Sequence, residues 1–150
     1  MTLALRHAAL GLALALASGL AAAQATPAGL WKTVDDSTKK EKSLVRIVES
    51  GGVYTGKVEK IIDPDSPKDA VCKDCTDDRK DKPVLGMTII RNMKASADKD
   101  VFEGGDILDP NNGKVYSAKL TLVDGGKKLD VRGYVGMPML GRTQTWQRVE

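Results

Sequence analysis

Beyond residue 25, hydrophobic and polar residues alternate in short runs that are separated by turn-forming residues. Glycine with Ser or Asp interrupts the runs at short intervals, as in Ser50-Gly51-Gly52 and Asp124-Gly125-Gly126. This spacing is typical of an antiparallel sandwich or barrel rather than of alternating strands and helices. The eight predicted strands run approximately Leu30–Val34, Ser43–Glu49, Val53–Ile62, Leu85–Asn92, Val101–Leu108, Val115–Val123, Lys128–Val135 and Thr143–Val149.

The short links between these segments favour strands that follow one another up and down. Eight strands in this order can close on themselves, which removes both exposed edges and leaves room for one small ligand. The predicted fold class is therefore all-β, an eight-stranded antiparallel up-and-down barrel formed by residues 26–150. Two segments break the pattern: the charged residues 63–83, which contain both cysteines, and the apolar residues 136–141 before the last strand.

Residues 1–25 have the features of a cleavable secretory signal peptide. A short segment carries Arg6, an apolar run continues to Leu20, and small residues then allow cleavage after Ala23 or Ala25. A membrane anchor is the alternative, but a spanning helix needs about 20 predominantly apolar residues, and this run is rich in weakly apolar alanine. No later segment is apolar enough to be transmembrane, so we expect a periplasmic or secreted protein.

Cleavage removes Arg6 and leaves 22 Lys and Arg against 20 Asp and Glu in the mature chain. These charges are interspersed and aromatic residues are few, so we expect no nucleic-acid partner. Cleavage also removes His7, the one histidine, which excludes histidine-based triads and histidine-ligated metals. We therefore predict no catalytic residue, no metal and no cofactor.

Cys72 and Cys75 form a C-x-x-C motif, and in an oxidising compartment they are expected to form a disulfide bond. A thiol–disulfide oxidoreductase is the enzymatic alternative. That chemistry needs a stabilised thiolate, which the neighbouring carboxylates of Asp74, Asp77 and Asp78 disfavour. A metal site is a third reading, although it needs more ligands than two cysteines.

In the last strand, Arg142, Gln144 and Trp146 share one face because side chains alternate with period two. If Trp146 points inward, the other two enter the barrel as well. A buried arginine needs a partner, either a ligand carboxylate or phosphate or an internal carboxylate at the barrel end. Met87 and Ile89, which share a face with Leu85, are candidate apolar lining, or simply core.

Gly29-Leu30-Trp31, together with an arginine on the last strand, resembles the lipocalin (calycin) fingerprint. The resemblance implies that the tryptophan closes the barrel floor and that the arginine lies over it in a cation–π contact. Arg148 is the expected partner, and Arg142 is the other arginine on that strand. Gly29, Trp31 and Arg148 are thus the predicted barrel-closing residues.

The mature chain also resembles, nearly end to end, a bacterial exported family known as domain of unknown function 2147. The matching motifs are Gly29-Leu30-Trp31, Cys72-Lys73-Asp74-Cys75, Asp78-Arg79, Gly86-Met87, Ile107-Leu108-Asp109-Pro110, Gly113-Lys114-Val115-Tyr116, Arg132-Gly133-Tyr134 and Leu140-Gly141-Arg142-Thr143-Gln144-Thr145-Trp146. This resemblance implies a lipocalin-like barrel in the cell envelope and brings no established activity.

Three functions follow from these patterns. The first is a barrel that binds or carries a small apolar or amphipathic ligand, with Arg142 and Gln144 at its head group. The second is a structural or interaction module with a filled barrel, in which residues 63–83 or Met137–Leu140 contact a partner protein. That partner could be a second copy of the chain, which would make a homodimer. The third is the C-x-x-C oxidoreductase. We expect the first.

Overall fold

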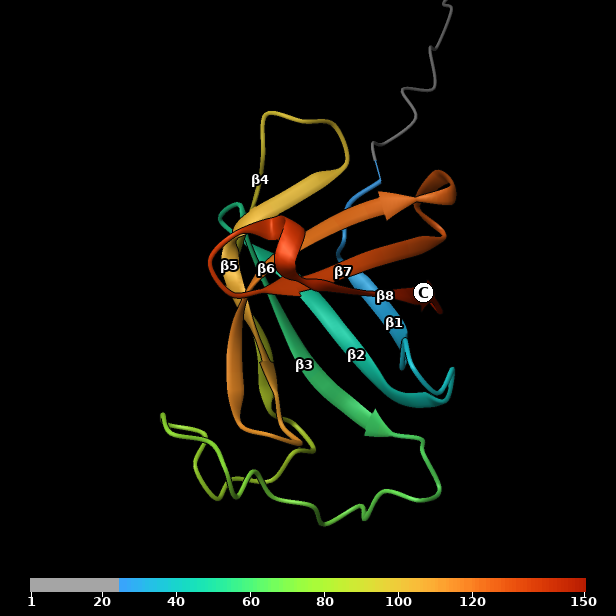
Figure 1. The fold of residues 1–150 in the computed structure, drawn as a ribbon. Coiled ribbons are helices and arrows are strands. Elements are labelled where there is room, and N and C mark those ends of the chain that lie inside the picture. The colour runs from blue at the N-terminus through green and yellow to red at the C-terminus, as the bar shows by residue number, and fades with distance from the viewer. Residues whose placement is uncertain (1–24) are drawn as a thin grey trace, which may run out of the picture.

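The computed structural model describes residues 25–150, so the predicted signal peptide lies outside the described residues except for its last position. Eight antiparallel strands follow one another in chain order and close into a barrel (Figure 1). The strands are β1 (Gly29–Val34), β2 (Glu41–Ser50), β3 (Val53–Ile61), β4 (Thr88–Ala95), β5 (Val101–Asp109), β6 (Lys114–Val123), β7 (Lys128–Tyr134) and β8 (Arg142–Arg148). The predicted all-β up-and-down barrel is confirmed.

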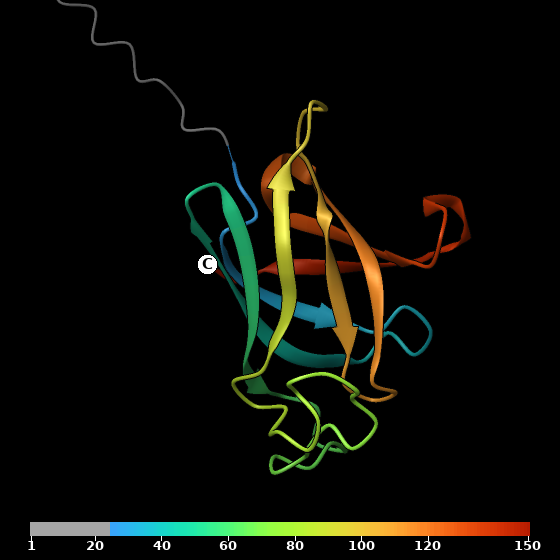
Figure 2. The same ribbon diagram turned by 90° about the vertical axis from the view of Figure 1, so that its left-hand side faces the viewer.

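The barrel closes where β8 pairs with β1, with Trp31 opposite Arg148. Alternate connections lie at opposite ends because neighbouring strands are antiparallel. The long β3–β4 connection lies at one end of the barrel, together with the β1–β2, β5–β6 and β7–β8 connections (Figure 2). The last of these contains the short 3-10 helix η2 (Pro138–Leu140), and a second, η1 (Asp124–Gly126), lies at the opposite end.

Because side chains alternate with period two along each strand, apolar side chains point into the barrel. In β2, Val45 and Ile47 are buried, whereas Val48 on the other face is 48 % exposed. In β7, Leu129 and Val131 point inward in the same way. Inward apolar residues on each strand therefore form one core, which excludes water and holds the strands together.

The fourth strand differs from its prediction. It begins at Thr88, because Gly86 adopts a left-handed backbone conformation and makes a turn that pairs with Val58. The predicted inward position of Leu85 is wrong, since that side chain is 48 % exposed. A bulge follows in β4, where two residues oppose one of β3, and it turns both Ile89 and Ile90 inward.

Residues 63–83 fold into an ordered cap at the barrel end. Cys72 and Cys75 form the predicted disulfide bond, with a Cα–Cα distance of 5.5 Å and both residues buried. The buried Arg79 donates to the Asp77 carboxylate and, at 2.9 Å, to the Thr88 carbonyl oxygen. This contact ties the cap to the first residue of β4.

Candidate functional site

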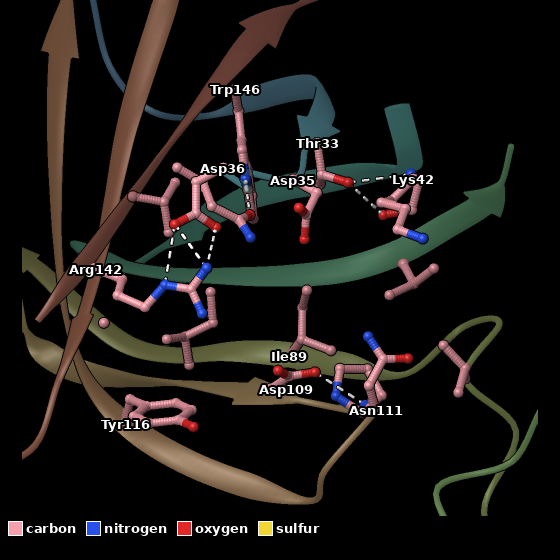
Figure 3. A pocket seen from close by; sticks show the side chains of 18 of the residues that line it. Thr33, Asp35, Asp36, Lys42, Ile89, Asp109, Asn111, Tyr116, Arg142 and Trp146 are labelled. Carbon is pink, nitrogen blue, oxygen red and sulfur yellow. Dashed lines mark hydrogen bonds and ion pairs between the residues drawn. The ribbon is translucent and has the colours of Figure 1, made fainter. Parts of the chain in front are cut away.

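A cavity of about 500 Å³ lies inside the barrel and reaches the end that carries the cap and η2 (Figure 3). Ligand pockets usually measure about 300–1,000 Å³. Its apolar walls come from strands all around the barrel: Val58, Ile61, Ile89, Ile107, Val131 and Trp146. The barrel interior is thus open to a small molecule and is not completely filled by side chains.

Arg142 lies at the rim of this cavity, and its side chain is 70 % exposed. Its guanidinium donates to both carboxylate oxygens of Asp36, at 2.8–3.0 Å, and to the Ser37 hydroxyl at 2.7 Å. These bonds to Asp36 raise the pKa of Arg142 above its ordinary value. Arg142 does not enter the barrel, because β8 begins there, at the barrel end. Of the two partners that the sequence left open, the structure shows a carboxylate of the protein itself, that of Asp36.

A second ion pair joins the rim to the cap, between Lys42 on β2 and the buried carboxylate of Asp63. Asp63 also accepts from the Asp65 backbone N–H at 2.9 Å and the Ser66 hydroxyl at 3.1 Å. The Lys42 ammonium, followed by the Asp65 N–H, lowers the pKa of Asp63 to about 2. Both cations on the cavity lining are therefore already paired with carboxylates of the protein.

The Asp63 pair predicts a loss of stability in acid. Its carboxyl has a lower pKa in the folded chain than its ordinary 3.8, so its contribution is complete above pH 3.8 and disappears as the pH falls towards 2. We expect Asp63→Asn to lower the free energy of unfolding at pH 7 and to make its decline in acid shallower. Urea denaturation at several pH values measures both, with Asp65→Asn as the control for removing an exposed carboxylate. An unchanged acid slope in Asp63→Asn would contradict the assignment.

Trp146 and Gln144 face the barrel interior from β8, as their spacing predicts. Trp146 is buried and its indole Nε1 donates to the Gln144 side-chain oxygen at 3.0 Å. Ile89 also lines the cavity, because the β4 bulge turns it inward. Met87 is buried but does not line the cavity, since it belongs to the turn before β4.

Several residues that line the cavity were not predicted as site residues from the sequence. The β1–β2 loop brings Asp35 and Asp36 to the rim, and Asp109, the last residue of β5, reaches it from the other side (Figure 3). Tyr116 lines the same cavity from β6. Aspartates in turns are usually explained by turn formation, and Asp109 does accept from the Asn111 backbone N–H at 2.9 Å. Their position around one opening depends on barrel closure.

The opposite end of the barrel carries the predicted closing residues. The Arg148 guanidinium carbon lies 4.3 Å from the ring centroid of the fully buried Trp31. Arg148 also donates to the carbonyl oxygens of Thr26 at 2.6 Å and Ala28 at 2.9 Å, and burial lowers its pKa. Gly29 has a φ of 141°, and a side chain there would collide first with the Glu150 backbone carbonyl oxygen and then with this guanidinium, which explains the glycine. The arginine over the tryptophan is Arg148.

Residues 25–150 contain neither a ready group of metal ligands nor a membrane-spanning helix. No three His, Cys, Asp or Glu side chains in this part of the chain are grouped so that they could hold a metal ion. None of its helices has both the length and the apolar character needed to cross a membrane.

Comparisons with known proteins agree with this geometry. One solved structure, a protein described as "Protein HP1028 from the human pathogen Helicobacter pylori belongs to the lipocalin family", superposes with a TM-score of 0.69. The two sequences are 20% identical, and the match covers 84% of each chain, so the likeness is one of fold. No curated protein sequence matches the chain. Residues 29–148 match the family described as "Uncharacterized protein conserved in bacteria (DUF2147)", and the chain therefore belongs to the DUF2147 family and has a lipocalin-like fold.

Proposed function

We propose that this protein binds a small apolar or amphipathic molecule inside its barrel. The observation that carries the proposal is the cavity of about 500 Å³, with apolar walls and a polar rim, in a barrel that is otherwise closed. Pockets with this combination hold the apolar body of a ligand and orient its polar end. The lipocalin-like fold of the H. pylori neighbour supports the same function by analogy of fold.

We place the protein in the cell envelope or outside the cell as part of this proposal. The predicted signal peptide supports this location, and so does the Cys72–Cys75 disulfide, because disulfides persist in oxidising compartments. The N-terminal residue of protein isolated from the envelope tests it. We expect Gln24 or Thr26, and an intact Met1 would contradict it.

Dye binding provides the direct test of the function. N-phenyl-naphthylamine is uncharged and fluoresces strongly only in apolar surroundings, so we expect a saturable increase at one dye per chain of the mature protein. Decanol should compete with the dye for the same cavity. Fluorescence that rises without saturation, or that decanol leaves unchanged, would contradict the proposal. Native mass spectrometry of protein from its own envelope would then show the mass of a co-purified ligand.

The apolar β7–β8 connection favours a second candidate function, which is contact with a partner protein. The partner could be a second copy of this chain. Four large apolar side chains are exposed there: Val135, Met137, Met139 and Leu140. Flexible methionine-rich surfaces adapt to irregular partners, and exposed apolar patches often mark contact sites. Sedimentation velocity distinguishes this case. A dimer that becomes a monomer in Met139→Ser/Leu140→Ser would support it, and a wild-type monomer would argue against the homodimer.

The oxidoreductase alternative has little support in the geometry. The residues that carry the two sulfurs are buried within the core, out of reach of a substrate disulfide. Thiol–disulfide exchange requires direct attack by one sulfur on another, so a reactive cysteine must be accessible. We therefore propose that the Cys72–Cys75 bond holds the cap in place.

A further inference from the structure

The orientation of the Gln144 amide is determined by its neighbour. The Trp146 indole N–H can only donate, and it donates to Gln144 Oε1 at 3.0 Å. The carbonyl end of the amide must therefore face Trp146, and the NH₂ end must face away from it. Trp146 is 2 % exposed, so turning the amide over would bury an indole N–H without an acceptor.

The Gln144 NH₂ group is available to a ligand in the cavity. Gln144 lines the cavity, and among residues 25–150 its side-chain nitrogen makes no hydrogen bond. No side-chain nitrogen or oxygen in that part of the chain is buried without a partner, so this nitrogen is accessible to the cavity. Along β8 it lies between Arg142 at the rim and the deeper Trp146. A ligand that enters the barrel therefore meets an oriented donor below the rim.

The charges around the opening decide which acceptor suits this donor. Arg142 is paired with Asp36, and Lys42 is paired with Asp63. Two more carboxylates line the cavity, Asp35 and Asp109, and neither has a lysine or arginine within ion-pair distance in the described chain. A ligand carboxylate would thus meet an excess of negative charge, and like charges repel more strongly where water is partly excluded.

We propose that Gln144 is the specificity-determining residue of the cavity, and that it selects ligands with an uncharged hydrogen-bond acceptor, such as an ester, ketone or amide carbonyl. This inference rests on the proposed function and names the ligand class for the same cavity. It differs from the carboxylate or phosphate head group that an inward-facing Arg142 would bind. Trp146 acts as a positioning residue, because it keeps the amide nitrogen turned towards the ligand.

The test compares two competitors of equal chain length, methyl decanoate and decanoate, for displacement of N-phenyl-naphthylamine. We expect the ester to bind the wild-type protein more tightly than the carboxylate. Gln144→Glu keeps an acceptor for the Trp146 indole but has no N–H to donate when ionised, and Gln144→Met removes the donor without adding charge. Both should weaken methyl decanoate about two- to tenfold, the range for one net hydrogen bond, after correction for the dye affinity measured for each variant.

Gln147→Glu is the matched control, because Gln147 lies on the same strand but on the exposed outer face. It adds the same charge as Gln144→Glu and should leave ester binding unchanged. Equal or tighter binding of decanoate, or equal effects of the two glutamate variants, would overturn the inference while leaving a cavity that binds ligands. A wild-type protein that does not bind the dye would instead refute the proposed function itself. Trp146→Phe supplies a second readout, since freeing the amide to turn over should reduce the preference for the ester.

Discussion

Trp31→Ala is expected to lower the free energy of unfolding by about 3–5 kcal/mol, the range for removing a large aromatic side chain from a core. Trp31 is fully buried in β1, beside the β1–β8 pairing that closes the barrel. Its indole Nε1 donates to the Pro27 carbonyl oxygen at 2.8 Å, and Arg148 lies over its ring. Single domains are stable by only about 5–15 kcal/mol, so this loss is a large part of the total. Urea denaturation followed by circular dichroism measures it.

Trp31→Phe separates volume from the polar contacts. Phenylalanine retains most of the apolar volume but loses the N–H bond to Pro27 and part of the cation–π contact with Arg148. We expect a loss of about 1–2 kcal/mol, from one net hydrogen bond and a weaker cation–π contact. A Trp31→Ala variant as stable as Trp31→Phe would show that the tryptophan does not close the barrel floor.

Val131→Trp is expected to weaken dye binding more than tenfold, because the larger ring occupies the cavity. Val131 is buried in β7 and lines the cavity wall. Indole atoms placed there take the space that a ligand would fill, and the packing strain should cost about 1–3 kcal/mol of stability. Fluorescence titration with N-phenyl-naphthylamine measures the affinity, and denaturation of the same sample shows whether the fold is retained.

Val48→Trp is the control for this substitution, since Val48 is half exposed on the outer face of β2. It introduces the same ring outside the barrel and should bind dye as the wild type does. If Val131→Trp folds and still binds dye with wild-type affinity, the dye lies outside the barrel. The exposed apolar segment Met137–Leu140 beside the opening would then be the first candidate for the dye-binding site.

The strand arrangement could be predicted from local pattern alone. Except for β4, every observed strand end lies within two residues of its prediction, because period-two alternation marks the strands and glycine turns mark their ends. The prediction for β4 was wrong because Gly86 makes a turn inside an apolar run, and because a bulge puts Ile89 and Ile90 on the same side of the strand. A bulge depends on how two strands align, and this has no simple signature in one of them.

The site was predictable only in part. Gln144 and Trp146 face the interior as their spacing requires, and Ile89 lines the cavity. Arg142 follows the same alternation, but its place at the strand end leaves it at the rim. Alternation determines the face on which a side chain lies, whereas its depth depends on where the barrel ends.

The residue pattern alone was enough to predict the strand order and the closed barrel. The contact of Trp31 with an arginine of the last strand was predicted from the resemblance to lipocalins, and the structure identifies that arginine as Arg148. Three features became visible only in the folded chain: the interior is open, Arg142 pairs with Asp36, and Gln144 presents its amide nitrogen to the cavity. These features could not be predicted because they depend on contacts between residues that are far apart in the sequence. Turns and alternation act between neighbours along the chain, but Asp36 and Arg142 are 106 residues apart and meet only because the first and last strands pair. The space left inside depends on how side chains from all eight strands pack together.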